Sequence, residues 1–200
     1  MSQPSVNLDQ IYKDIWDLLS IGAQKAKSDY HLGYLATSDG SNPRIRTVVL
    51  RKVLRDQKSL IIHTDYRSKK VEEIEKNPNV SILFYSKEDK IQIRLEGKAS
   101  LYTEGELFEI QWEESRPLSR RCYLIQPGPG SITNEPSSGI PYDLKDRAPT
   151  EEESEPGKAN FCIIKINAES IEWLNLHSSG HIRAKFIISK WKVISDWLMP

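Results

Sequence analysis

The feature that most restricts the fold is a series of short segments with strand character that follows one amphipathic helix. In 7–27, apolar residues recur at helical spacing, and Asn7 or Asp9 can cap the helix. Segments rich in β-branched and alternating apolar residues come next, at 33–37, 45–52, 58–64, 80–85, 91–101, 161–166, 171–176, 182–188 and 192–198. Further helices are predicted at 67–76 and 104–114. Many short strands with few helices predict a mainly β (α+β) fold, either a barrel or a sandwich.

A long segment at about 126–159 interrupts this pattern. Its first part is rich in proline and glycine, and an acidic run at 151–155 follows. A loop of this length is either functional or partly disordered. Strand-like sequence resumes directly after it, so we interpret it as an excursion within one domain that covers 1–200.

Charge and cysteine content exclude several classes of protein. The 28 Lys and Arg residues balance the 28 Asp and Glu residues, whereas a duplex-binding protein normally carries a basic excess, so we expect no nucleic-acid partner. Cys122 and Cys162 lack the spacing of a metal site or a redox pair. No apolar run is long enough to span a bilayer, and 1–9 lacks the pattern of a secretory signal. We therefore expect a cytoplasmic protein with no membrane partner.

Arginines alternate with apolar residues along the predicted strand at 44–52. Side chains on a strand point alternately to opposite faces, so this pattern can aim guanidinium groups from one face while the other fills a core. An ordinary solvent-exposed strand face would carry the same pattern.

The segment 63–70 combines a strand end, a turn and a helix start. Ser68, Lys69 and Lys70 occupy the first turn of the predicted helix, where cations are unfavourable because the N-terminus already carries partial positive charge. A bound anion would explain the two lysines, since backbone N–H groups and a hydroxyl can hold a phosphate. A solvated basic turn is the alternative.

Gln92 and Arg94 share one face of the predicted strand at 91–101. A strand glutamine can both donate to and accept from the edge of a heteroaromatic ring, although most strand glutamines are surface residues.

Taken in chain order, these motifs resemble those of the pyridoxamine 5′-phosphate oxidase-like flavoproteins. The matching segments are 46–51, 63–70, the strand from Gln92 into 97–99, 119–124 and 127–130. The resemblance covers nearly the whole chain after the first helix and is closest to a flavin-binding subgroup of uncharacterised activity. It implies an FMN-binding split β-barrel with an N-terminal helix and short peripheral helices. It also implies a homodimer with FMN in a cleft between the subunits.

The resemblance assigns expected roles to individual residues. Those expected at the phosphate and ribityl end of FMN are Arg46, Ser68, Lys69 and Lys70. Those expected along the flavin, partly through backbone groups, are Val48, Val49, Leu50, Arg51, His63 and Thr64. Gln92 of the partner subunit is expected to approach the ring, and Lys185 matches an arginine that contacts the flavin in the oxidases.

The chain departs from the oxidases at their substrate contacts. Arg51 stands where they carry a lysine. In their Tyr-x-x-x-Arg-x-x-x-Ser group only Arg116 is kept, because the flanking positions are Trp112 and Arg120. We expect Arg116, His181 and Arg183 to grip a small anionic substrate, with His181 also suited to proton transfer.

Three functions remain open on these residues. The leading one is an FMN-dependent oxidoreductase. The differences from the oxidases at their substrate contacts leave open whether it oxidises pyridoxamine 5′-phosphate itself. A non-enzymatic flavin-binding redox sensor or stress protein is the second. A barrel that holds a different anionic cofactor, such as a deazaflavin or haem, is the third.

Overall fold

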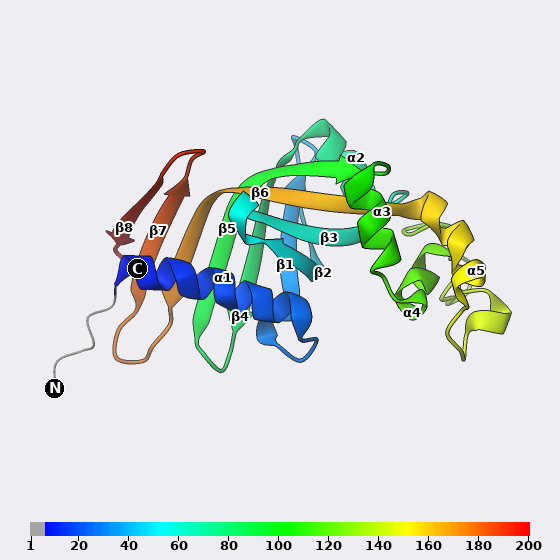
Figure 1. Ribbon diagram of the computed structural model, residues 1–200, viewed down its shortest axis with the longest axis horizontal. Helices are drawn as coiled ribbons and strands as arrows, with labels where there is room; N and C mark the ends of the chain where they lie inside the picture. The colour runs from blue at the N-terminus through cyan, green and yellow to red at the C-terminus, as the bar shows by residue number, and fades with distance from the viewer. Residues whose placement is uncertain (1–6) are drawn as a thin grey trace.

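The computed structural model describes residues 7–200 of the chain and begins with the predicted amphipathic helix (Figure 1). Helix α1 covers Leu8–Gln24, and the side chain of Asn7 caps it by accepting from the Asp9 N–H at 2.8 Å. Ile15 and Leu19 of its apolar stripe are fully buried. The sequence argument about a secretory signal rests partly on 1–6, which lie outside the described residues.

A closed antiparallel barrel forms the centre of the molecule. Its strands are β1 (Leu32–Ser38), β2 (Pro43–Leu54), β3 (Ser59–Asp65), β4 (Asn79–Ser86), β5 (Ile91–Tyr102) and β6 (Phe161–Asn175). They follow the order β3-β2-β1-β4-β5-β6, and pairing of β3 with β6 closes the barrel. Strands β7 (Ile182–Ile188) and β8 (Val193–Leu198) extend the sheet from β6. The predicted mainly β, split-barrel fold is thus confirmed.

Strand β6 corrects one detail of the sequence prediction. The segments predicted as separate strands at 161–166 and 171–176 form one strand, which pairs with β3 in its first half and with β7 in its second. Strand β5 pairs along both halves of β6, and a bulge at Glu169 of β6, opposite Glu96 and Gly97, accommodates the bend. A Cβ on Gly97 would lie 1.9 Å from the Asn167 carbonyl oxygen, so this close approach requires glycine.

Short helices surround one end of the barrel. They are α2 (Lys69–Lys76), α3 (Glu106–Glu113), α4 (Pro117–Arg120) and α5 (Glu151–Ser154). Helix α3 begins two residues later than predicted, because Gly105 and not Thr103 stands at its N-cap. The segment at about 126–159 contains α5 and two 3-10 turns, Tyr142–Leu144 and Glu155–Asn160. It is therefore partly helical, and it packs beside α4.

Two apolar clusters hold these parts together. The larger one fills the barrel and the space under α1. The smaller one joins Phe108 and Trp112 of α3 to Phe161 of β6 and Tyr123, so the helical end is anchored on the barrel wall. No helix in the described range 7–200 is long and apolar enough to cross a membrane.

Candidate functional site

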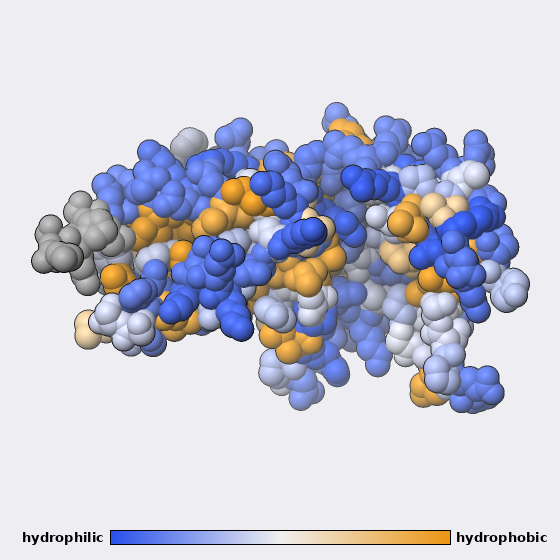
Figure 2. Space-filling view, turned by 90° about the horizontal axis from the view of Figure 1, so that it is seen from below, coloured by the Kyte–Doolittle hydropathy of each residue, from blue (hydrophilic) through white to orange (hydrophobic). Residues whose placement is uncertain are grey.

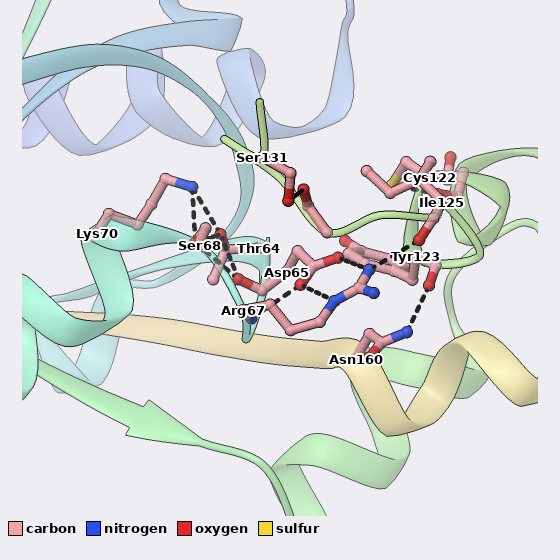
Figure 3. Close-up of polar contacts among 12 residues, drawn as sticks. Thr64, Asp65, Arg67, Ser68, Lys70, Cys122, Tyr123, Ile125, Ser131 and Asn160 are labelled. Carbon is pink, nitrogen blue, oxygen red and sulfur yellow. Dashed lines mark hydrogen bonds and ion pairs between the residues drawn. The ribbon is translucent and has the colours of Figure 1, made fainter. Parts of the chain in front are cut away.

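The ammonium group of Lys70 lies in a cradle of hydroxyl groups at the start of α2. Its Nζ donates to Thr64 Oγ1 and to Ser68 Oγ, each at 3.0 Å, and these two oxygens lie 3.2 Å apart (Figure 3). Thr64 and Ser68 are buried. Within residues 7–200, no carboxylate oxygen comes within 4.0 Å of this nitrogen. The cradle thus surrounds a cation with neutral groups only.

The surroundings of Lys70 disfavour the charged form of its amine. Burial lowers the pKa of Lys70, and the nearby Arg46 guanidinium lowers it further. Helix α2 begins here, and Ser68 at its N-cap makes no side-chain cap bond, which leaves N–H groups of the first turn free. Lysine, hydroxyls and a helix N-terminus together form a donor set that fits a phosphate.

Arg46 lies beside this cradle but is held by the protein itself. Its Nη2 donates to Glu73 Oε2 at 2.7 Å, and its Nη1 contacts Thr37 Oγ1. Glu73 is only 5% exposed and also pairs with Arg44 at 3.2 Å. The structure therefore places Thr64, Ser68 and Lys70 in direct contact, with Arg46 close enough to lower the pKa of Lys70. It adds a buried carboxylate, Glu73, that orients Arg46.

The remaining residues of this predicted group have different surroundings. Lys69 is exposed, and its side chain makes no hydrogen bond or ion pair with the residues described in 7–200. Val48 and Leu50 are buried in the barrel core, so only their backbone groups are available to a ligand. Val49, between them, is partly exposed, as alternation along a strand requires.

A pocket of about 350 Å³ opens on the α3 and α4 side of the barrel. Its wall includes Ala23, Gln24, Ala26, His31, Arg51, His63, Gln111, Glu114, Ser115, Arg116 and Ser119. Arg51 reaches it because the register of β2 against β3 shifts between Leu50 and Lys52, which leaves Arg51 as the extra residue of a bulge. Arg51 and Arg116 are exposed and make no ion pair within 7–200. The pocket therefore presents two arginines without carboxylate partners.

One side of this pocket is built by a hydrogen-bonded row of polar side chains. His63 Nε2 lies 3.2 Å from Gln111 Oε1, and Gln111 Nε2 donates to Glu114 Oε2 at 2.7 Å. Lys52 Nζ binds both oxygens of the same carboxylate, at 3.0 and 2.8 Å. Burial lowers the pKa of His63 to about 4, and Arg51 adds to that effect. The His63 ring is thus neutral near pH 7.

A third group of predicted residues lies on the outer face of β5, β6 and β7. Gln92 is opposite Leu174, which is opposite Arg183, so Gln92 and Arg183 share one row across the sheet. Lys185 lies in the next row, 3.7 Å from Glu172. His181 is exposed just before β7 and makes no side-chain contact within the described residues.

One chain does not bring all the predicted site residues together. Arg116 stands at the start of α4, whereas Arg183 and Lys185 belong to β7. Figure 1 shows α4 and β7 at opposite ends of the long axis. The predicted substrate group of Arg116, His181 and Arg183 is therefore divided between two surfaces of the chain.

Trp112 and Arg120 both lie outside the pocket that Arg116 lines. Trp112 is 1% exposed and donates through Nε1 to Glu155 at 3.1 Å. Arg120 is 6% exposed, stacks on the Trp112 ring and donates to the Trp112 carbonyl at 2.8 Å. These two positions hold α3, α4 and α5 together, so they do not replace the tyrosine and serine of the oxidases.

The sequence argument missed several residues of the site. Glu73, Gln111, Glu114 and Lys52 were not singled out. Helical spacing offered a signal, because Glu73 follows Lys70 by three positions and Glu114 follows Gln111 by three, which places each pair on one helix face. The partners across the barrel could not be read from spacing.

Comparison with known proteins finds related FMN-binding domains and oxidases. Residues 15–103 match the family model described as pyridoxamine 5′-phosphate oxidase, FMN-binding domain. Pyridoxine/pyridoxamine 5′-phosphate oxidase 2 of Arabidopsis thaliana is 28% identical over 178 residues, which are 84% of this chain and 86% of the relative.

Two solved structures share the fold. A pyridoxamine 5′-phosphate oxidase-related FMN-binding protein from Nostoc punctiforme superposes with a TM-score of 0.74 at 20% identity, over 100% of both chains. PhzG from Burkholderia lata, in complex with tetrahydrophenazine-1-carboxylic acid, gives a TM-score of 0.67 at 16% identity, over 100% of this chain and 98% of the other. Residues 15–103 therefore match the FMN-binding domain of the pyridoxamine 5′-phosphate oxidase family, the whole chain has the fold of these FMN-binding proteins, and the domain match indicates FMN as the cofactor.

Proposed function

We propose that this protein is an FMN-dependent oxidoreductase that acts on a small anionic substrate as a homodimer. The observation that carries the proposal is the pocket of about 350 Å³, whose wall presents Arg51 and Arg116 without carboxylate partners. Unpaired arginines that converge on one cavity favour an anionic guest, because each can form charge-assisted hydrogen bonds with it.

The cradle at α2 supplies the cofactor site in this proposal. Lys70 and Arg46 would bind the FMN phosphate, with Thr64 and Ser68 as the hydroxyl groups that hold Lys70 in place. When bound, FMN supplies the redox chemistry by accepting a hydride equivalent from the substrate. The chain's own residues then have the tasks of binding, orientation and charge placement.

A homodimer explains why the predicted residues are divided between two surfaces. Gln92, Arg183 and Lys185 point away from the core of their own chain, so they can complete a site on a second copy. Exposed apolar side chains on the strands support such an interface, among them Ile45 at 68% and Trp197 at 46%. Hydrophobic residues are also visible between hydrophilic ones on the face in Figure 2.

The names of the relatives support an anionic substrate. The Arabidopsis relative is named for a phosphate ester, and the PhzG structure contains a carboxylic acid. Arginine binds either group through two parallel N–H donors. Arg116 and Arg51 would bind the anion, while Ser119 in the same wall can add a hydroxyl donor.

Anaerobic reduction of the bound flavin tests the enzymatic proposal. Pyridoxine and pyridoxamine 5′-phosphate, together with small carboxylates, are mixed with FMN-loaded protein, and bleaching of the flavin absorption is followed. We expect at least one anion to bleach it, and Arg116→Ala to lower kcat/KM roughly 10- to 100-fold through loss of a charged hydrogen bond.

Arg55→Ala is the matched control, because Arg55 is exposed, pairs with Asp17 and does not line the pocket. A flavin that no anion reduces would favour the non-enzymatic alternative.

Light scattering of the FMN-loaded protein tests the dimer, and a monomer that retains FMN would refute that part of the proposal.

A further inference from the structure

We propose that Gln111 and Glu114 hold His63 as the neutral tautomer protonated at Nε2, so that Nδ1 offers a lone pair to the guest of the pocket. The guest is then an anion that also carries an O–H or N–H donor. This inference deepens the proposed function, because it concerns the same pocket. His63 would contact the guest, whereas Gln111 and Glu114 are positioning residues.

The direction of the hydrogen bonds starts at Lys52. Its ammonium group donates to both oxygens of Glu114, at 3.0 and 2.8 Å, and this bond lowers the pKa of Glu114. An ionised carboxylate can only accept. The group that lies 2.7 Å from Glu114 Oε2 must therefore be the amide nitrogen of Gln111.

The orientation of Gln111 then fixes the proton on His63. With its nitrogen facing Glu114, the amide turns its oxygen toward His63 Nε2 at 3.2 Å. An amide oxygen only accepts, so Nε2 must carry the hydrogen. Gln111 is 2% exposed, which leaves it no room to turn toward solvent.

The other ring nitrogen is left free. No described residue bonds to His63 Nδ1. The buried side-chain nitrogens and oxygens without a partner in 7–200 are Tyr12 Oη, Trp16 Nε1 and Arg94 Nε. Since His63 Nδ1 is not among them, solvent reaches it, and His63 lines the pocket.

The surroundings keep the ring neutral. Arg51 and Arg116 line the same pocket as His63, and Phe161 lies edge-on at 4.9 Å. Burial disfavours an imidazolium ion at His63, and the positive charge of Arg51 adds to that effect, whereas Glu114 opposes it. The pocket thus combines cations for an anion with an uncharged acceptor at His63 Nδ1, and a guest without a donor would leave that acceptor unsatisfied.

Nitrogen-15 NMR of histidine-labelled protein tests the tautomer without reference to activity. His63 is identified among the four histidines by comparison with His63→Gln. We expect a proton on Nε2 and none on Nδ1, both with and without FMN. Gln111→Leu should release this preference and give a tautomer mixture, whereas Gln10→Leu on the exposed face of α1 should leave the spectrum unchanged. A wild-type ring protonated on Nδ1, or already mixed, would overturn the proposal.

Chemical modification tests the accessible lone pair and the class of guest. Diethyl pyrocarbonate acylates an unprotonated ring nitrogen, so His63 should be modified at neutral pH. Mass spectrometry of peptides measures this modification. Glycolate, which carries a hydroxyl, should protect His63 roughly 2- to 10-fold better than acetate. An unreactive His63 would overturn the open acceptor, and equal or absent protection by the two anions would overturn the donor requirement. FMN binding, measured separately by flavin fluorescence, shows whether the proposed function fails instead.

Discussion

Two clusters of cations in this molecule differ in what neutralises them. On the outer face of β5–β7, Arg94, Arg183 and Lys185 share the carboxylate of Glu172, with Arg94 at 2.8 Å and Lys185 at 3.7 Å. At the start of α2, Lys70 has only hydroxyl oxygens as direct partners. The cations of the first cluster pair directly with a carboxylate, whereas Lys70 has no carboxylate oxygen within 4.0 Å among the described residues.

The pKa shifts follow from this difference. Burial alone would raise the pKa of Glu172, but Arg183 and Arg94 outweigh it and hold the pKa below the ordinary value. At Lys70, burial and Arg46 act in the same direction and lower the pKa of the ammonium group. An ammonium ion whose charged form is disfavoured in this way gains most from an external anion. This difference supports the proposal that the FMN phosphate binds at the start of α2.

The largest effect is expected from Lys70→Met. The side chain keeps its length and loses its charge, so FMN affinity should fall roughly 100-fold through loss of a charge-assisted contact of about 2–3 kcal/mol. Riboflavin, which lacks the phosphate, should bind the variant and the wild type alike. Fluorescence quenching of each flavin during titration measures both affinities.

Lys98→Met is the control for this comparison. Lys98 is 60% exposed in its side chain and lies 3.7 Å from Glu169, so its loss should leave FMN binding unchanged. If Lys70→Met binds FMN as tightly as the control, the distinction between the two clusters does not concern the cofactor.

A smaller effect is expected from Glu172→Gln. Removing the shared carboxylate leaves Arg94, Arg183 and Lys185 without counter-charge, although their partial exposure lets water screen them. We expect the free energy of unfolding to fall by about 1–2 kcal/mol in urea titrations. Glu169→Gln, at a 57% exposed side chain, should change it by less than about 0.5 kcal/mol. Equal losses in the two variants would show that Glu172 is an ordinary surface acid.

The smallest effect is expected from Glu73→Gln, which tests whether the α2 cradle depends on a positioned arginine. Two opposing results are possible, because Glu73 repels a phosphate but also orients Arg46. Its burial between Arg46, Arg44 and Thr37 favours the orienting role. We expect FMN affinity to fall roughly 3- to 10-fold, about 1 kcal/mol, with riboflavin unaffected. Tighter FMN binding would show that the main effect of Glu73 is to repel the phosphate.

Local sequence patterns predicted most elements of the fold. Helical spacing located α1 and its Asn7 cap, and alternation located β1 to β5 to within about two residues. The polar residues at 167–170 gave a false break in β6, because backbone pairing with β5 continues through a bulge that side-chain alternation does not reveal. The helical pieces inside 126–159 were also not predicted, since each is too short to show a period.

Contiguous motifs predicted the α2 cradle better than the pocket. Thr64, Ser68 and Lys70 lie within seven positions of the chain, so one turn between β3 and α2 brings them together. His63 and Gln111 are 48 positions apart, and their contact depends on how α3 packs on the barrel. No spacing rule predicts such a contact.

The sequence by itself determined the barrel strands, the helix start that concentrates positive charge, and the resemblance to FMN-binding proteins. These properties depend on residues close in the chain, where periodicity and local electrostatics act. The tertiary structure decided which cations are already neutralised, at Glu73 and Glu172, and which face an open pocket, at Arg51 and Arg116. It did so because ion pairing and burial depend on distances across the barrel, which the packing of strands and helices sets.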